Sequence, residues 1–243
     1  MKSIGIPSSV AYIGDEAFSN CTSLESVDMQ DGLSSIGSNA FENCTSLQYV
    51  HIPSTLSNIR ENGFINCNRL SSVNLPDGLR HIGIFAFYNC TNLVSVDIPD
   101  TVSDFGDCTF ENCTSLKKAV IGNGAGFIGG YVFSGCRALE DVTIGSNVGT
   151  LYDSAFGGCT SLSSIYIPSN VYEIYSSVFN SCTGLKRVEI HGSDINIRND
   201  AFWNCPALED LTIFGKTTAE VQEMDEYPWG IEDTSVIHGS LDS

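Results

Sequence analysis

The sequence predicts a solenoid, in which short coils of equal length stack on one another and share one continuous core. The first observation is a constant period, since nine of the ten cysteines stand 23 residues apart, from Cys21 to Cys205. The second is that a phenylalanine stands three positions before each of these cysteines and a leucine three positions after it. The third is that no insertion or deletion breaks the period between Met1 and Phe214. A fixed period of roughly 20 to 50 residues is the signature of a repeat architecture.

Each 23-residue unit contains one short strand. In residues 47–52 (LQYVHI), Val50 and Ile52 alternate with polar neighbours, which is typical of a half-buried strand. Pro53 has no amide hydrogen and ends the pairing. The stretch ENGFINC, residues 61–67, fits one helical turn and is too short to be stable alone. Because one unit cannot bury its own apolar face, neighbouring units must stack, and we expect their strands to form one long parallel sheet.

The periodic cysteines are expected to be buried, unreactive thiols that fill a corner of each coil. Metal binding is excluded by the absence of a CxxC pair or of cysteine and histidine at zinc spacing. Neighbouring coils bring Cα atoms to about 5 Å, which a disulfide tolerates, but the number of periodic cysteines is odd. Cys108 stands off the period and is expected to be the first thiol that a reagent reaches. The predicted structural ladder consists of Phe18, Cys21, Phe41, Cys44, Phe64, Cys67, Phe87, Cys90, Phe110, Cys113, Phe133, Cys136, Phe156, Cys159, Phe179, Cys182, Phe202 and Cys205.

The repeat departs from the commonest leucine-rich form, in which Asn or Cys forms a ladder five positions after the second strand leucine. Here Gly32, Thr55 and Gly78 occupy that position, and Phe-x-x-Cys-x-x-Leu is expected to replace the asparagine ladder. The combination in IPSSVAYIGDEAFSNCTSLESV, residues 6–27, closely resembles the BspA-like (Treponema pallidum type) leucine-rich repeat family, over about nine units. The resemblance implies a right-handed α/β-type leucine-rich-repeat solenoid of about ten coils, with a parallel sheet on one face and short helical or 3-10 turns opposite. It also implies adhesion or protein recognition without catalysis, usually on a bacterial surface, in a phage or in a parasitic protist.

The end of the period divides the chain into a solenoid, residues 1–214, and an expected C-terminal cap, residues 215–243. Thr217 and Glu220 have the spacing of a capping box, which predicts a short helix that runs to about residue 224. Residues 234–238 (TSVIH) are expected to add a last strand. The apolar side chains of this segment would then cover the open end of the core.

Charge and motifs exclude several classes of function. The chain has 11 Lys and Arg against 29 Asp and Glu, a net charge of −18, which repels nucleic acid and anionic membranes and favours either simple solubility or basic partners. No apolar run approaches the roughly 18 residues of a membrane span. The four histidines share no motif with a nucleophile, and GNGAGFIGG, residues 122–130, lacks the GKS or GKT ending of a phosphate loop. We therefore expect no enzyme, no metal and no cofactor.

The localisation stays open. Met1 stands at the strand position equivalent to Leu24, without a secretion signal or a polar cap before it. Three explanations remain: a fragment of a longer exported protein, a phage or intracellular protein, or an assembly subunit whose first coil a partner covers.

The candidate binding residues are those expected to point outward from the strands, together with tyrosines that share a register on successive coils. They are Tyr49, His51, Asn74, Asp97, Tyr166, Arg187 and Glu189 on the strands, and Tyr152 and Tyr175 beside them. Variation in these columns fits either selection for a partner or drift on a solvated surface. The predicted function is a non-catalytic recognition or adhesion module that binds a protein or glycan through the exposed sheet face. The alternative is a structural spacer or assembly subunit, such as a phage tail or surface-layer component, that stacks end to end through its first coil.

Overall fold

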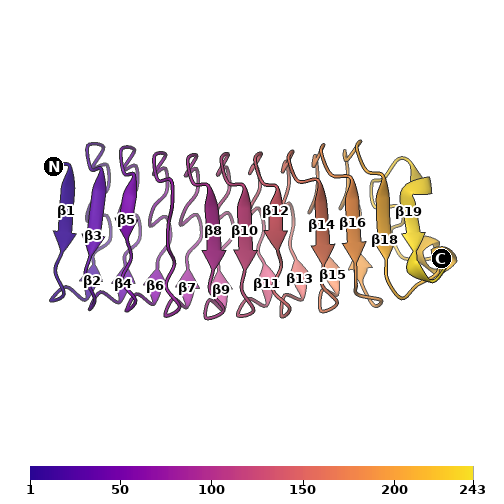
Figure 1. Cartoon of the computed structure of the whole chain (residues 1–243), viewed down its shortest axis with the longest axis horizontal. Coiled ribbons are helices and arrows are strands. Elements are labelled where there is room, and N and C mark those ends of the chain that lie inside the picture. Colours follow the sequence, from indigo (N-terminus) through magenta and orange to yellow (C-terminus); the bar gives the residue numbers. More distant parts are fainter. Residues whose placement is uncertain (243) are drawn as a thin grey trace.

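The computed structural model describes residues 1–242 as an elongated stack of parallel coils, with the two ends of the chain at opposite ends of the stack (Figure 1). Strands of successive coils pair in parallel at a register of 23 residues, for example Ile4 with Val27. The typical coil has a longer strand, a two-residue strand and a return arm of turns. The predicted stacking of 23-residue coils is therefore confirmed.

The longer strands form a first row along the solenoid, the long-strand face. Its strands are β1 (Ser3–Ile6), β3 (Ser26–Met29), β5 (Tyr49–His51), β8 (Ser95–Ile98), β10 (Lys118–Ile121), β12 (Asp141–Thr143), β14 (Ser164–Ile167), β16 (Arg187–Ile190) and β18 (Asp210–Ile213). They hydrogen-bond in three sheets, β1–β3–β5, β8–β10–β12 and β14–β16–β18–β19, so the expectation of one uninterrupted sheet is wrong. The coil between β5 and β8 has no strand in this row. Both interruptions coincide with a half-buried valine, Val73 or Val142, whose counterparts in the other coils are buried except for Ile4 in the first coil.

A second row of parallel strands, each only two residues long, was not predicted from the sequence. It consists of β2 (Tyr12–Ile13), β4 (Ser35–Ile36), β6 (Asn58–Ile59), β7 (His81–Ile82), β9 (Asp104–Phe105), β11 (Phe127–Ile128), β13 (Thr150–Leu151), β15 (Glu173–Ile174) and β17 (Asn196–Ile197). These strands pair in two sheets, β2–β4–β6–β7–β9 and β11–β13–β15–β17. The second residue of each is buried, so this row closes another side of the core.

The return arm is a chain of turns held to the next coil. Within the arm, the amide of Cys44 donates to the carbonyl of Phe41 at 3.2 Å, a three-residue spacing typical of 3-10 turns. Between coils, the amide of Phe41 donates to the carbonyl of Gly63 at 2.9 Å. Asn39 (φ 53°) and Asn43 (φ 56°) are left-handed, a conformation that asparagine tolerates better than most residues. The arm thus satisfies its amides without a regular helix.

An asparagine ladder links the return arms of the first four coils, although none was expected. Asn43 Nδ2 donates to Asn20 Oδ1 at 3.1 Å, Asn66 Nδ2 to Asn43 Oδ1 at 2.8 Å, and Asn89 Nδ2 to Asn66 Oδ1 at 2.9 Å. The prediction that Phe-x-x-Cys-x-x-Leu replaces such a ladder is therefore wrong. The ladder lies one position before the cysteine, where the left-handed backbone itself favours asparagine.

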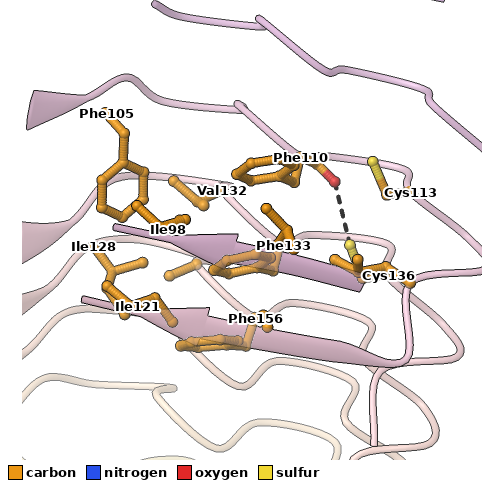
Figure 2. Packing of buried hydrophobic residues seen from close by; sticks show 14 of the residues in the cluster. Ile98, Phe105, Phe110, Cys113, Ile121, Ile128, Val132, Phe133, Cys136 and Phe156 are labelled. Atoms are coloured by element: carbon orange, nitrogen blue, oxygen red, sulfur yellow. Dashed lines mark hydrogen bonds between the residues drawn. The ribbon is translucent and has the colours of Figure 1, made fainter. Parts of the chain in front are cut away.

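Phenylalanine rings and cysteines form two parallel columns in the core (Figure 2). Adjacent rings of the column lie between 5.1 Å (Phe18 to Phe41) and 5.7 Å (Phe110 to Phe133) apart, centroid to centroid, and are close to parallel. From Cys44 onward, each periodic thiol donates to the phenylalanine carbonyl 26 residues earlier, for example Cys136 Sγ to Phe110 O at 3.2 Å. The cysteines therefore add one weak hydrogen bond between coils, besides filling the corner.

Burial raises the pKa of these thiols, to about 12 for Cys113 and well above the usual value for Cys136. Cys108 is partly buried, as are Cys21 and Cys205, whereas the other cysteines are buried, and the expectation that a reagent reaches Cys108 first stays a prediction. Burial, followed by a hydrogen bond with Glu111, raises the pKa of Cys108 to about 12. A thiol in this state is a poor nucleophile at neutral pH.

The last 28 described residues fold against the final coil (Figure 1). They form α1 (Thr218–Gln222), two 3-10 turns (Thr234–Val236 and Ser240–Asp242) and β19 (Ile237–Gly239), which pairs with β18. The capping box is present: the Thr217 amide donates to Glu220 Oε2 at 2.7 Å and the Glu220 amide to Thr217 Oγ1 at 3.3 Å. The helix ends two residues earlier than expected, and the strand begins three residues later.

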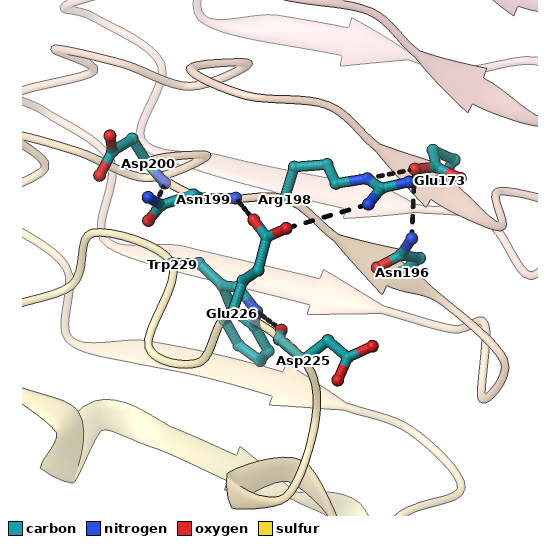
Figure 3. Close-up of polar contacts among 8 residues, drawn as sticks. All are labelled: Glu173, Asn196, Arg198, Asn199, Asp200, Asp225, Glu226 and Trp229. Carbon is teal, nitrogen blue, oxygen red and sulfur yellow. Dashed lines mark hydrogen bonds and ion pairs between the residues drawn. The ribbon is translucent and has the colours of Figure 1, made fainter.

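Buried and polar contacts attach this segment to the repeats (Figure 3). Trp229 is fully buried, and its Nε1 donates to the carbonyl of Asp225 at 3.0 Å. Glu226 accepts a hydrogen bond from the Asn199 amide and lies 3.9 Å from Arg198 Nη1. Arg198 Nε also donates to Glu173 at 2.7 Å, which links the segment through one side chain to the coil before the last.

Candidate functional site

The long-strand face carries seven of the predicted binding residues, but it does not bring them all together. Tyr166 lies on β14 and is the register partner of Glu189 on β16, while Ser164 is that of Arg187. Tyr166, Arg187 and Glu189 therefore lie in one patch. The remaining four are exposed at other coils of the same face. Tyr49 and His51 lie on β5, Asn74 lies in the coil that has no long strand, and Asp97 lies on β8.

The distance between these two parts of the face follows from the coil spacing. His51 and Tyr166 occupy the same column, five repeats of 23 residues apart. At about 4.8 Å per coil they are separated by roughly 24 Å. Only a partner of protein or oligosaccharide length could contact both.

A stack of aromatic rings supports Tyr166. The Tyr166 ring centroid lies 4.5 Å from that of His191, which lies 4.0 Å from that of Phe214. Arg187 stands beside the stack, 3.6 Å from Glu189 and 3.3 Å from Asp210. We call the set Tyr166, Arg187, Glu189, His191 and Phe214 the Tyr166 patch. His191 and Phe214 were not predicted. They stand in a column that holds proline or glycine in every earlier coil except at Gln30, and this change was the available signal.

Tyr152 and Tyr175 belong to the row of short strands. Their rings are 4.9 Å apart, and Tyr152 also packs edge-on against Phe127 at 5.7 Å. Each follows directly after a two-residue strand, β13 or β15, so neither belongs to the long-strand face. The predicted binding residues thus divide between two surfaces.

Beside Tyr152 the surface is hollowed into a groove of about 560 Å³. We call it the short-strand groove, because it runs beside β7, β9, β11 and β13. The side chains that define its chemistry are Glu61, His81, Asp104, Asp107, Phe127, Tyr131, Tyr152 and Asp153. His81 Nδ1 lies 3.1 Å from Asp104 Oδ2. Of these residues only Tyr152 was predicted as a candidate; the groove follows from the unpredicted second row of strands.

The described residues show neither a metal-binding cluster nor a membrane-spanning helix. Within residues 1–242, no group of three or more His, Cys, Asp or Glu side chains is placed to hold a metal ion. In the same part of the chain, no helix has the length and apolar character to cross a membrane. What the two surfaces offer is exposed aromatic rings with charged groups beside them, which suits binding.

Parallel coils with inward leucine, phenylalanine and cysteine columns define a leucine-rich-repeat solenoid. Residues 1–117 and 106–224 match the BspA type leucine rich repeat region, in six copies, and the chain belongs to this family. The predicted family and the predicted α/β-type leucine-rich-repeat fold class are thereby confirmed. No curated protein matches the sequence.

Solved structures agree with this assignment. A leucine rich repeat protein of T. pallidum (TpLRR) is 29% identical, with a TM-score of 0.64, over 66% of this chain and 77% of that one. A leucine-rich repeat protein of Bacteroides ovatus shares the fold at 23% identity and a TM-score of 0.59, over 98% of this chain and 84% of that one. Leucine-rich-repeat solenoids are in general interaction modules without catalysis, and that is the class of protein to which the chain belongs.

Proposed function

We propose that this protein is a recognition or adhesion module that binds a protein or glycan on its long-strand face, with the Tyr166 patch as the main contact. The single observation that supports this is the exposure of Tyr166: 52% of its surface is open to solvent although its ring is held in an aromatic stack. Exposed tyrosine on a rigid frame supplies a large contact area and loses little conformational freedom on binding.

Charged groups beside the ring add direction to such a contact. Arg187 is 59% exposed at its side chain, and its guanidinium reaches both Glu189 and Asp210. An arginine oriented by two carboxylates presents its remaining donors in a fixed geometry, to a carboxylate or hydroxyl of a partner. Arginine and tyrosine are also among the residues that contribute most often to binding energy at interfaces.

Tyr49, His51, Asn74 and Asp97 form the outer part of the proposed surface. They lie on the same face as the Tyr166 patch, so an extended partner that follows the strand row would meet both. We expect them to contribute less, because no aromatic ring packs against Tyr49 in the described chain. They extend the surface, and the patch anchors it.

The test uses ligand libraries, because the partner is unknown. The protein is screened against displayed random peptides and against a glycan array, and each ligand found is measured again with variants. Tyr166→Thr is a matched change, since Thr143 and Thr212 occupy the same column in other coils. Tyr49→Ser, matched to Ser26 and Ser72, is the control. We expect Tyr166→Thr to weaken binding by about thirtyfold, the effect of an interface hot spot, and Tyr49→Ser to have a small effect. Ligands that bind both variants equally well, or the absence of any ligand, would contradict the proposal.

A second candidate function, assembly through the first coil, has one observation in its favour. β1 pairs with β3 on one side, and its other edge has no partner strand within residues 1–242. Ile4 and Phe18 in the same coil are only half-buried. If coils of two chains stack there, sedimentation should show dimers or filaments that disappear in Ile4→Lys. A protein that stays monomeric at micromolar concentration would exclude this alternative.

A further inference from the structure

The short-strand groove has the dimensions of a ligand site, and glycines form its floor. Its volume of about 560 Å³ lies within the range of roughly 300 to 1,000 Å³ that small-molecule and side-chain sites occupy. Gly83 and Gly106 line it. In the same column, Arg60 stands one coil before Gly83, and Tyr152 follows Gly129. A Cβ at Gly83 or Gly106 would meet the backbone of the preceding coil, at Glu61 or Ile84, so glycine allows the coils to approach closely along the groove.

Aromatic rings around the groove are open to solvent. Phe127 is 37% exposed, Tyr131 46% and Tyr152 38%. Tyr131 also borders an adjoining apolar hollow of about 490 Å³, which Phe85 lines as well. Exposed aromatic rings that gather at a concave site are typical of a binding surface, whereas single exposed rings need no explanation.

Two of these rings stand where the backbone disfavours them. Phe85 (φ 56°) and Tyr131 (φ 59°) are left-handed, and a bulky side chain is unusual in that conformation. The other coils place mostly small or polar residues there: Glu16, Asn39, Asn62, Cys108, Ser154, Ser177 and Asp200. Local backbone preference therefore does not explain the aromatic rings. An unfavourable residue that persists against local preference points to a function for the side chain.

The charge of the groove is negative. Four carboxylates line it, from Glu61, Asp104, Asp107 and Asp153, and no lysine or arginine is among the residues that line it. His81 is the only basic residue among those that line the groove, and its Nδ1 lies 3.1 Å from Asp104 Oδ2. Asp107 Oδ1 accepts from the Gly130 amide at 2.7 Å, which fixes one carboxylate at the groove. A net charge of −18 on the whole chain strengthens the attraction for a cation.

We propose that the short-strand groove binds a basic segment of a partner protein, with an arginine or lysine side chain inserted between the aromatic rings and the carboxylates. A guanidinium stacks on the face of tyrosine or phenylalanine and donates to carboxylates in its own plane. Tyr131, Tyr152 and Phe127 supply the rings, and Asp104 and Asp153 supply the acceptors. This surface is separate from the long-strand face, so the inference does not depend on the proposed function.

The test measures the binding of a fluorescein-labelled peptide, (Gly-Arg)₄, to the full chain by fluorescence anisotropy. Three matched variants change the groove to residues that other coils already hold at the same position. Tyr131→Asn copies Asn39 and Asn62, Asp153→Ser copies Ser38 and Ser176, and Tyr152→Arg copies Arg60. Tyr49→Ser on the long-strand face is the control, and circular dichroism verifies that each variant is folded.

We expect Tyr131→Asn and Asp153→Ser each to weaken binding about fivefold, since one cation–π contact or one charge-assisted hydrogen bond corresponds to about that factor. Tyr152→Arg, which fills the groove with a cation, should abolish binding, and Tyr49→Ser should leave it unchanged. Binding that Tyr131→Asn leaves unchanged and that Asp153→Ser weakens only slightly would show attraction to the net charge of −18 alone and overturn the proposal. Binding of a neutral oligosaccharide in the groove, with no binding of the peptide, would overturn it as well.

Discussion

Replacing Phe133 by alanine should divide the unfolding of the solenoid into two steps. Phe133 is fully buried, and its ring lies 5.7 Å from that of Phe110 and 5.5 Å from that of Phe156. The change removes the contacts of the ring on both sides and leaves a cavity that two rigid coils cannot close. Such substitutions cost about 3–5 kcal/mol. Because coils contact only their neighbours, this loss falls on the two interfaces of one coil and weakens the coupling between the halves of the stack.

The two tryptophans make the division measurable. Trp203 and Trp229 both lie C-terminal to Phe133, so their fluorescence reports the C-terminal coils alone, while far-UV circular dichroism reports the whole chain. In urea, the two signals should have the same midpoint in the unmodified protein and different midpoints in Phe133→Ala. Phe18→Ala is the matched control, because Phe18 is half-buried and stacks on one ring only, Phe41 at 5.1 Å. It should cost about half as much and leave the two signals coincident.

Coincident transitions in Phe133→Ala, with a midpoint close to that of the unmodified protein, would refute this reasoning. That result would mean that the coils reorganise around the cavity, or that cooperativity extends well beyond nearest neighbours. A midpoint that falls strongly while the two signals stay coincident would support the expected cost of the cavity. It would refute the assumption that coils are coupled only to their nearest neighbours.

The remaining predictions concern the thiols, the asparagine ladder and the C-terminal segment. Burial raises the pKa of Cys113 to about 12 from a usual 9.0, so stability is unaffected below pH 9 and falls between pH 9 and 12, where only the unfolded thiol ionises. The free energy of unfolding falls by about 1.4 kcal/mol per pH unit for each buried thiol. Cys113→Ala should remove the share of one thiol from this pH dependence. Urea midpoints that stay level between pH 9 and 11 would contradict the prediction. Asn66→Ala should destabilise the protein by about 1–2 kcal/mol, because it removes the ladder hydrogen bonds and places alanine in a left-handed backbone conformation. Asn66→Gly should cost less, because glycine adopts that conformation freely. Equal melting temperatures for the two variants would show that the backbone conformation contributes nothing to the difference. Deletion of residues 215–243 should cause aggregation, because β18 and the last coil lose their cover, and we expect light scattering to rise on purification; a truncated protein of unchanged solubility and melting temperature would show that this segment is not a cap.

The core could be predicted from the sequence because burial in a repeat acts on whole columns. Leu47 and Phe41 must meet the same environment as residues 23 positions away, so the apolar columns stay constant while the rest of the coil varies. The register of the long strands follows directly from this period. The interruptions of this row do not follow from the period, because Val73 and Val142 are half-buried where other valines of the same column are buried, and the residue type is the same.

The candidate sites were predicted less completely, for two physical reasons. A strand of two residues, such as Phe127–Ile128, is too short to show alternation, so the short-strand row and its groove were missed. The commonest repeat form has its asparagine ladder five positions after the second strand leucine. Here the left-handed turn before the cysteine carries the ladder instead. In each case a column was present in the sequence: glycines at Gly83 and Gly106, and asparagine at Asn66 and its counterparts.

The in-register stacking of identical turns has a consequence for how the length of this protein can change. Removing any 23 consecutive residues within the repeats joins two positions that already lie one coil apart, about 4.8 Å from each other. The new junction therefore needs no new turn, and the remaining coils meet through the same columns as before. Recombination between repeats in the gene would thus shorten or lengthen the molecule by whole coils, moving one end of the solenoid while each surviving face keeps its shape.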